Sequence, residues 1–424
     1  MKRVRHARWW IVALISCGTI INYLARNSLA VLAPQLQHVL SITIPEYSYV
    51  IGAFQLAYAL MQPACGLVVD RVGVRLGFAL FGAIWSLALM GHALVTGWIG
   101  LAFFRGLLGM SEAAMVPAGM KAISEWFPLR DRSTATGWFN AGTSLGSALA
   151  PPLIIAISLA SSWQMSFVAT GAIGLLWAAV WYLVYRSPGA NRASVPQPDA
   201  PILSGPDRAP PRAAARAILT SRRFRALATA RVFIDPTWQT LSFWVPLYLA
   251  RVRGMDLKHI AMFAWLPFLA ADFGGVFGGY LSPLLARRLR MSVVFSRIAG
   301  VAVGAVLMIA VSSVGLVASP YTAILLLCIG GFAHQMISVL HTTLSADVFP
   351  LAQVGTAVGF IGQVGWISGA AFSLAIGQVV GRIGFTPIFA CLSVFDLIAA
   401  AVLLASRRQL QATATETAER GFAF

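Results

Sequence analysis

The chain contains twelve apolar runs, each about as long as the roughly 20 residues that a helix needs to cross a bilayer. These runs cover residues 9–31, 47–69, 77–96, 98–120, 133–157, 163–185, 224–250, 258–283, 292–313, 320–343, 353–377 and 385–406. Of all residues 58% are hydrophobic and 11% are charged, and the mean hydropathy is +0.77, a composition that excludes a soluble globular domain. We therefore predict an all-α membrane protein with twelve transmembrane helices, the first of them a retained span rather than a cleaved signal peptide.

A segment rich in proline and arginine divides these runs into two sets of six. Residues 186–222 have a composition that cannot bury a core, which predicts a flexible linker. The expected parts are therefore a first half at 1–185, the linker at 186–222 and a second half at 223–424. Two six-helix halves are typical of transporters whose halves rock about a site between them.

Basic residues between the runs predict the orientation in the bilayer. Lys and Arg near span ends stay on the cytoplasmic side, and an inside N-terminus places most of the 31 basic residues there, with both termini cytoplasmic. The net charge of +17 is spread over several loops, as membrane topology requires. We therefore expect the lipid bilayer, and no nucleic acid, as a partner.

Cysteine and histidine give no sign of a metal or an enzyme. The four cysteines fall in separate apolar runs without histidine at ligand spacing, and the six histidines form no pattern such as His-Glu-x-x-His. We expect no disulfide, no metal, no cofactor and, without a converging nucleophile and base, no enzymatic activity.

Three charged residues inside the apolar runs are the first candidates for a binding site: Arg26, Arg105 and Glu112. A charge near the centre of a membrane helix costs about 3 kcal/mol or more. A passive structural bundle or a receptor would gain nothing from such residues, which argues against both classes. Arg105 and Glu112 lie on one face of a helix, so they can form either a static pair or a functional one. A guanidinium offers a carboxylate two parallel hydrogen bonds, which favours an organic anion as the ligand.

Residues 66–75, Gly-Leu-Val-Val-Asp-Arg-Val-Gly-Val-Arg, resemble the loop signature of the major facilitator superfamily. The resemblance implies a twelve-helix fold with two six-helix pseudo-symmetric halves. Asp70, Arg71 and Arg75 are then expected to form a charge cluster that gates the cytoplasmic mouth, although an ordinary charged turn is the alternative. Residues 278–283 look like a degraded echo of the signature, with proline where an acid is expected.

Other segments resemble the anion:cation symporter family, most of all its bacterial hexuronate and sugar-acid transporters. The matching segments are 22–27 (Asn-Tyr-Leu-Ala-Arg-Asn), 105–114, 125–128, 137–142, 235–238, 271–274, 333–335 and 347–350. The resemblance covers nearly the whole chain. It implies a monomeric transporter in the bacterial inner membrane that imports a hexuronate or related sugar acid by alternating access, in symport with protons.

The same resemblance assigns roles in the first half. Arg26 is expected to bind the substrate carboxylate, Asn22 to orient it or bond a hydroxyl, and Tyr58 to line the cavity. Glu112 is expected to carry the coupled proton under the control of Arg105. The alternatives are an Arg26 satisfied by helix carbonyls or an acid, a Tyr58 that packs in the core, and a static Arg105–Glu112 pair.

The second half supplies neutral candidates for the hydroxyls of a sugar acid, although such side chains in membrane helices more often pack or bridge helices. The candidates are Trp238, Gln239, His334, Gln335 and Gln363. Arg231 and Asp235 stand four residues apart, a spacing that favours a local ion pair.

Ala25 is the main departure from the family pattern, which has an aspartate directly before Arg26. Three accounts stay open: Glu112 suffices with a changed stoichiometry, the protein is a uniporter or an exchanger of another carboxylate such as a dicarboxylate or aromatic acid, or Ala25 is an introduced substitution that arrests the cycle. A drug:proton antiporter is the nearest rival in mechanism, but it would prefer acids facing a cation, whereas the expected cavity is net positive.

Overall fold

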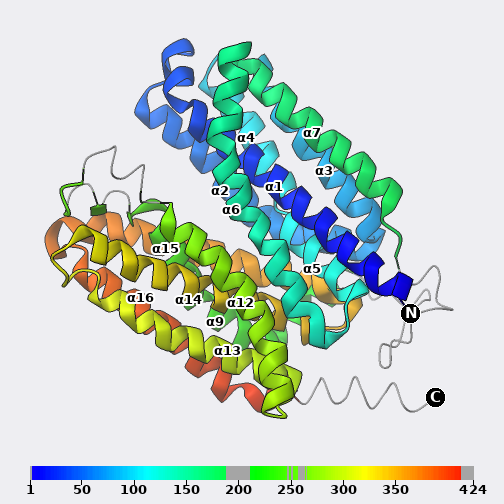
Figure 1. Cartoon of the computed structure of the whole chain (residues 1–424). Coiled ribbons are helices and arrows are strands. Elements are labelled where there is room, and N and C mark those ends of the chain that lie inside the picture. The colour runs from blue at the N-terminus through cyan, green and yellow to red at the C-terminus, as the bar shows by residue number, and fades with distance from the viewer. Residues whose placement is uncertain are drawn as a thin grey trace. The chain divides into compact units, whose positions relative to one another are not determined.

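The computed structural model describes residues 2–187, 211–245, 248–249, 252–255, 263 and 265–411, and every regular element in these ranges is helical. The elements are α1 (Lys2–Val39), α2 (Ile44–Val72), α3 (Val74–Gly91), η1 (His92–Leu94), α4 (Trp98–Glu112), α5 (Met115–Trp126), α6 (Leu129–Ala160), α7 (Trp163–Val184), α8 (Pro211–Thr220), α9 (Arg222–Phe243), α12 (Leu266–Arg288), α13 (Val293–Leu307), η3 (Met308–Ser313), α14 (Pro320–Asp347), η4 (Leu351–Gln353), α15 (Val354–Ile383) and α16 (Thr386–Ala405) (Figure 1).

Eleven segments of the described chain are helical, long and apolar enough to cross a membrane. They match eleven of the twelve predicted spans and confirm the all-α membrane class. The seventh predicted span, 224–250, begins as α9, and the eighth, 258–283, is described from α12 onward. Residues 246–247, 250–251, 256–262 and 264 lie outside the described residues.

The expected linker contains a helix. Residues 188–210 lie outside the described residues, but α8 follows them directly within the range 186–222. Its sequence explains this, because Pro211 suits the first turn of a helix and the alanines after it favour helix strongly.

The described helices group into two compact units. Unit 1 comprises Met1–Trp126, Phe139–Val195 and Ala352–Phe360, and unit 2 comprises Phe127–Trp138, Pro196–Leu351 and Ile361–Phe424. The start of α15 therefore belongs to unit 1, and the start of α6 belongs to unit 2.

Unit 1 is built on pairs of closely packed helices, α2 with α4 and α3 with α7, which lie side by side in Figure 1. Trp177 of α7 stacks on Trp85 of α3 with ring centroids 5.4 Å apart, and Phe78 meets Trp181 edge-on at 4.9 Å. These large buried rings fill the space between the two helices and fix their register.

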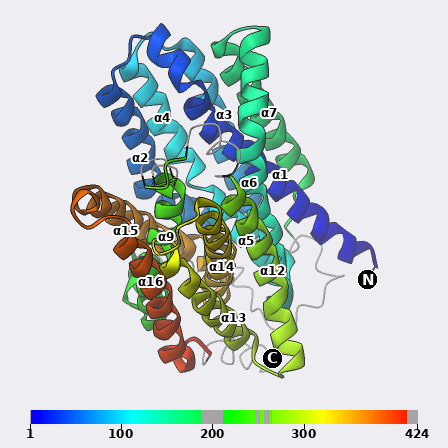
Figure 2. The same cartoon turned by 60° about the vertical axis from the view of Figure 1, so that its left-hand side comes forward.

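Unit 2 is organised around α14, which packs on both α12 and α13, while α9 packs on α16 (Figure 2). Glycine permits the closest approach: a Cβ on Gly274 of α12 would lie 1.9 Å from the carbonyl oxygen of Phe332 in α14. Any side chain there would force the two helices apart.

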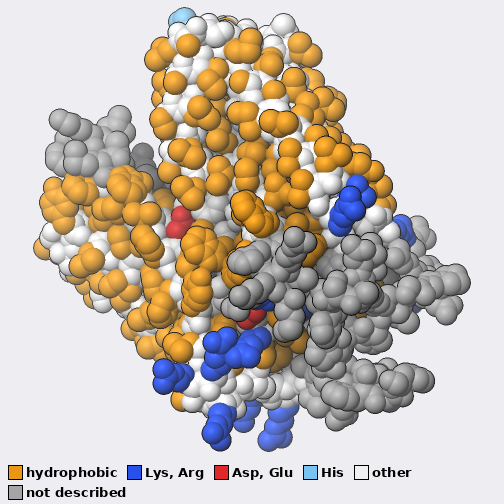
Figure 3. Space-filling view, turned by 45° about the vertical axis from the view of Figure 1, so that its right-hand side comes forward, with side chains coloured by type: hydrophobic (Ala, Val, Ile, Leu, Met, Phe, Trp, Pro, Cys, Tyr) orange, Lys and Arg blue, Asp and Glu red, His pale blue; other side chains and the backbone are white. Residues whose placement is uncertain are grey.

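A buried charge network closes one end of unit 2. Asp347, the last residue of α14, accepts hydrogen bonds from Arg132 (Nη1 to Oδ1, 3.1 Å) and from Arg297 (Nε to Oδ2). Arg297 also donates to Ser282, and neither Asp347 nor Arg297 has an exposed side chain. Figure 3 shows hydrophobic side chains over the flanks of the helices and few charged side chains among them. That distribution is the one expected of helices embedded in lipid.

Candidate functional site

Arg26 lies in the middle of α1 and forms an ion pair with Glu112 at the end of α4. The distance from Nε of Arg26 to Oε2 of Glu112 is 3.0 Å. Glu112 has no exposed side-chain surface, whereas the side chain of Arg26 remains 17% exposed. The guanidinium can therefore still be reached by a small solute while its acid cannot.

Three aromatic rings surround this guanidinium. Its central carbon lies 4.7 Å from the ring centroid of Tyr23, 4.9 Å from that of Tyr58 and 5.3 Å from that of Phe54. Ring faces attract a cation without neutralising it, so the charge of Arg26 is stabilised and remains available to an anion.

Glu112 stands at a break in the fourth predicted span. That span, 98–120, is two helices, because α4 ends at Glu112 and α5 starts at Met115. Pro117 lacks the N–H that would bond to the carbonyl of Ala113, and its ring clashes with the turn before it, which accounts for the break. Within the described chain, the second oxygen of Glu112, Oε1, has no hydrogen-bond partner.

Arg105 contacts α1 rather than pairing statically with Glu112. Its Nη1 donates to the carbonyl oxygen of Arg26 over 3.0 Å, while its Nε and Nη2 have no partner among the described residues. Its guanidinium carbon lies 5.8 Å from the ring centroid of Phe54, one of the rings around Arg26. Two neighbouring guanidiniums thus have one carboxylate near them, and that carboxylate bonds to Arg26, which leaves a surplus positive charge at this point of unit 1.

Asn22 and Ala25 lie close to Arg26 on α1, and both are fully buried. Neither amide atom of Asn22 has a hydrogen-bond partner in the described part of the chain. A buried amide without partners is costly, and a ligand hydroxyl or carboxylate would satisfy it. Ala25 offers no side-chain group, so Glu112 is the acid that the structure pairs with Arg26.

Close packing of α2 and α4 brings the rings to the charges. A Cβ on Gly109 would lie 2.4 Å from the carbonyl oxygen of Phe54, so glycine is needed at this contact. Phe54 then reaches both Arg26 and Arg105.

Asp70, in the loop signature at the end of α2, binds the start of α15 within unit 1. The backbone N–H of Thr356 donates to Oδ2 over 2.7 Å, its hydroxyl donates to the same atom over 2.6 Å, and the N–H of Gly355 donates to Oδ1 over 3.2 Å. A carboxylate at a helix N-terminus satisfies unpaired N–H groups and meets the positive end of the helix dipole.

The cation paired with Asp70 is one that the sequence analysis missed. Lys121 of α5 places its Nζ 2.7 Å from Oδ1 of Asp70. Arg75 instead donates from Nε to the carbonyl oxygen of Tyr182 over 2.8 Å, and Arg71 is exposed. The partners of Asp70 are thus Lys121 of α5 and the start of α15, whereas Arg75, which was expected beside it, bonds to α7.

The candidates of the second half fall into one ring cluster and three separate amides. Trp238 stacks on His334 with ring centroids 5.9 Å apart and meets Phe268 edge-on at 5.7 Å. Gln239 and Gln335 are buried and Gln363 is half-buried. The structure therefore brings Trp238 and His334 together.

Arg231 and Asp235 form the predicted ion pair on α9, with Nε 2.8 Å from Oδ1. Two residues after Asp235, Thr237 donates a hydrogen bond to Asp396 of α16 over 3.1 Å. The sequence analysis did not single out Asp396, although a lone acid in the apolar run 385–406 is the same signal that drew attention to Arg26.

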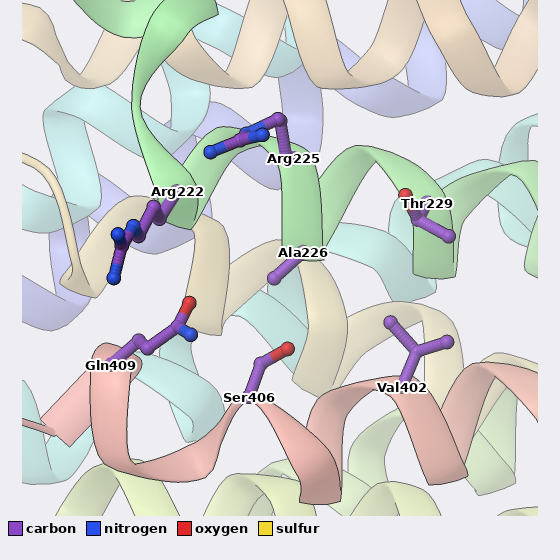
Figure 4. Close-up of a pocket in the computed structure, with 7 residues that line it drawn as sticks. All are labelled: Arg222, Arg225, Ala226, Thr229, Val402, Ser406 and Gln409. Carbon is purple, nitrogen blue, oxygen red and sulfur yellow. The ribbon is translucent and has the colours of Figure 1, made fainter.

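A basic surface pocket of about 340 Å³ lies between the start of α9 and the end of α16 (Figure 4). Its lining residues are Arg222, Arg225, Ala226, Thr229, Val402, Ser406 and Gln409. Neither Arg26 and Glu112 nor Trp238 and His334 line this pocket. Among the described residues, no group of three or more His, Cys, Asp or Glu side chains is placed to hold a metal ion.

Comparison with known proteins places the chain in a family. The family model described as Major Facilitator Superfamily matches residues 15–373. The hexuronate transporter of Escherichia coli strain K12 is 43% identical over 408 residues, which covers 95% of this chain and 94% of that protein. The galacturonate transporter of Dickeya chrysanthemi is also 43% identical, over 76% of this chain and 95% of its own length.

Solved structures agree on the fold. The human organic anion transporter MFSD10 has a TM-score of 0.70 at 18% identity and covers 93% of this chain and 99% of its own. The FucP transporter in its outward conformation has a TM-score of 0.69 at 15% identity, with 95% and 99% covered. Together with the helical fold, its membrane-spanning segments and the match over most of its length, these findings show that the chain belongs to the major facilitator superfamily.

Proposed function

We propose that the protein is a secondary active transporter that takes up an organic anion, a hexuronate or a related sugar acid, together with protons by alternating access. One observation carries the proposal: the partly exposed Arg26 pairs with Glu112, while the buried Arg105 next to it bonds to a backbone carbonyl and has no acid as a hydrogen-bond partner among the described residues. A surplus positive charge inside lipid favours an anionic ligand. The relatives named for hexuronate and galacturonate support the choice of substrate class.

Arg26 is proposed to hold the substrate carboxylate. It is the more exposed of the two arginines, and the rings of Tyr23, Phe54 and Tyr58 fix its guanidinium in place. Asn22 offers its unpaired amide to the same carboxylate or to a neighbouring hydroxyl. Trp238, Gln239, His334, Gln335 and Gln363 of unit 2 are the proposed partners of the remaining hydroxyls.

Competition for Arg26 explains how a proton is coupled to the anion. In the empty site Glu112 occupies the Nε edge of the guanidinium. When a substrate carboxylate displaces Glu112 from Arg26, the buried carboxylate of Glu112 loses its counter-ion. Protonation of Glu112 then costs less free energy than leaving its charge unpaired. The anion adds one negative charge and the proton adds one positive charge, so the loaded site carries the same net charge as the empty one. The positive charge of Arg105 is proposed to assist the later release of this proton by attracting the ionised carboxylate of Glu112.

Asp70 is proposed to act as a gate, together with Arg71 and Arg75, because its carboxylate ties α2 to the start of α15. Asp70→Asn keeps the side-chain shape but loses the charge that binds Lys121 and the helix dipole. We expect Asp70→Asn to slow transport while substrate binding to the purified protein changes little. A loss of binding as large as the loss of rate would contradict a gating role.

Exchange of one carboxylate for another is the second candidate. It is favoured by Ala25, which is fully buried and adds no acid beside Arg26. An exchanger would run counterflow without a pH gradient and show no net proton movement.

The proposed setting is the bacterial inner membrane, with a monomer whose two termini face the cytoplasm. The excess of Lys and Arg in the loops expected on the cytoplasmic side supports this orientation. The orientation can be tested with a cysteine introduced at Arg408, just after α16. Its labelling by a membrane-impermeant thiol reagent is measured in intact cells and in broken cells. We expect labelling only after the cells are broken. Labelling in intact cells would show that the C-terminus faces outward and would contradict the proposed orientation.

The direct test uses purified protein in liposomes with an alkaline interior. We expect saturable uptake of labelled glucuronate or galacturonate that collapses when a protonophore removes the pH gradient. Glucose, which lacks the carboxylate, is the control substrate and should not compete. Saturable uptake that depends on neither the pH gradient nor the protonophore would indicate exchange or uniport instead of symport. Competition by glucose would show that the carboxylate is not needed for binding and would contradict an anionic substrate.

A further inference from the structure

A second acid is buried in the membrane-spanning part of unit 2 and has no role in the function proposed above. Asp396 lies near the middle of α16, has no exposed surface and is the one charged residue of that helix. Its Oδ2 accepts a hydrogen bond from the hydroxyl of Thr237 over 3.1 Å. In the described part of the chain its other oxygen, Oδ1, has no partner.

No cation faces this carboxyl from the described elements around it. The element η3 contains no charged residue, and the one charged residue of α13, Arg297, is bonded to Asp347 and Ser282. In α15, which touches α16 through Phe372 and Phe395, the charged residue is Arg382 in the last turn.

Helix α9 contributes the charge that does act on Asp396, and that charge has the same sign. It belongs to Asp235, which is itself paired with Arg231 at 2.8 Å. The arginines at the start of α9 lie elsewhere, with Arg222 and Arg225 lining the exposed surface pocket. Asp235 thus has a guanidinium as its partner, whereas Asp396 has none among the described residues.

An ionised carboxylate in a medium of low dielectric needs a cation, and where the protein provides none a proton is the smallest one that can serve. We propose that Asp396 is a second proton-binding site, a carboxylic acid held by the Thr237 hydroxyl beside the Arg231–Asp235 pair. The free Oδ1 is the atom that carries the proton.

The neighbouring ion pair provides a way to exchange this proton. The side chains of Arg231 and Asp235 are 17% and 12% exposed, whereas Asp396 has no exposed surface, so a proton that reaches Asp396 from outside can pass by way of this pair. When Arg231 leaves Asp235, two adjacent carboxyls compete for the proton and titrate as a pair. Proton binding by Asp396 stands independently of the proposed function, and only its exchange during transport rests on that function.

Infrared spectroscopy of the purified protein at neutral pH tests the bound proton directly. Subtracting the spectrum of Asp396→Asn from that of the wild type should leave the C=O stretching band of a protonated carboxylic acid. Ser393→Ala is the matched control, because Ser393 lies about one turn earlier on α16 and its buried hydroxyl donates to the backbone carbonyl oxygens of Met308 and Phe389. If Asp396→Asn removes no such band, Asp396 carries no proton and the proposal is wrong.

The transport assay tests the exchange. In liposomes Asp396→Asn should lose several-fold in uptake driven by a pH gradient and keep its counterflow, and Ser393→Ala should match the wild type. Thr237→Val should shift the pH dependence of uptake. Its control is Thr240→Val, which removes a hydroxyl that donates to the carbonyl oxygen of Pro236 on the same helix.

The outcomes separate the two proposals. An Asp396→Asn variant with the wild-type pH dependence overturns the exchange of this proton, even if Glu112→Gln abolishes coupling. A wild type that moves no protons with its solute overturns symport, and the infrared band then still decides whether Asp396 binds a proton.

Discussion

Each unit contains one unbalanced set of charged residues among its helices, and the two imbalances have opposite signs. In the set of unit 1, Arg26 pairs with Glu112 while Arg105 has no acid as a partner among the described residues, so positive charge is in excess. In unit 2, Arg231 pairs with Asp235 while Asp396 has a threonine hydroxyl as its partner, so acid is in excess. Both sets are costly in lipid unless a further ion completes them, and the sign of the imbalance decides which ion that is. The first set calls for an anion and the second for a proton.

Removing the arginine of each unit should have very different effects. Arg26→Ala deletes the group proposed to bind the carboxylate, and losing a buried charged partner costs about 2–5 kcal/mol, so affinity for a hexuronate should fall by about a hundredfold or more. Arg231→Ala should change affinity by less than about threefold, equivalent to about 0.7 kcal/mol. Ligand-dependent thermal stabilisation measures both. Equal losses in the two variants would break the comparison.

Glu112→Gln should separate anion binding from proton coupling. The amide keeps the shape of the side chain but cannot take up the proton, so net uptake should lose its pH dependence while counterflow exchange continues. Paired assays of net uptake and counterflow across a range of pH provide the measurement. An unchanged pH dependence of net uptake would show that Glu112 is not the group that couples proton movement to transport.

Arg105→Met should weaken binding without abolishing it. Arg105 supplies the surplus charge but contacts α1 through a backbone carbonyl, so its loss should cost about 1–2 kcal/mol, or about tenfold in affinity. Calorimetric titration with a hexuronate gives the value. An affinity equal to that of the wild type would show that the surplus charge has no part in binding.

Tyr58→Phe should have the smallest effect. The ring stays over the guanidinium of Arg26 and only the hydroxyl is lost, which is worth about 0.5–1.5 kcal/mol, or about two- to tenfold in affinity. The same titration applies. A loss as large as that of Arg26→Ala would mean that the hydroxyl, rather than the ring, positions the site.

Much of the fold could be predicted from apolar run length alone, since a bilayer allows few alternatives to helices of about 20 residues. The break between α4 and α5 was missed because one proline acts locally inside a continuous apolar run. Helix α8 was missed because the prolines of 186–222 outweighed the alanines that follow them.

The charged residues of the site were found from their cost in lipid, but their partners were not. Helical spacing placed Arg105 and Glu112 on one face, whereas the structure pairs Glu112 with Arg26, which is 86 positions away in sequence. Lys121 and Asp396 carried the same signal as Arg26, and Lys121 was overlooked because the fourth span was expected to end at residue 120. The contact of Asp70 with the start of α15 spans 286 positions, and no local pattern marks it.

The most direct test of the central claim is the number of protons that the wild-type protein takes from a weakly buffered solution when it binds one hexuronate. Exchange of Glu112 for the substrate carboxylate at Arg26 predicts proton uptake at neutral pH that disappears in Glu112→Gln. Binding of the anion with no proton uptake by the wild type would contradict the account.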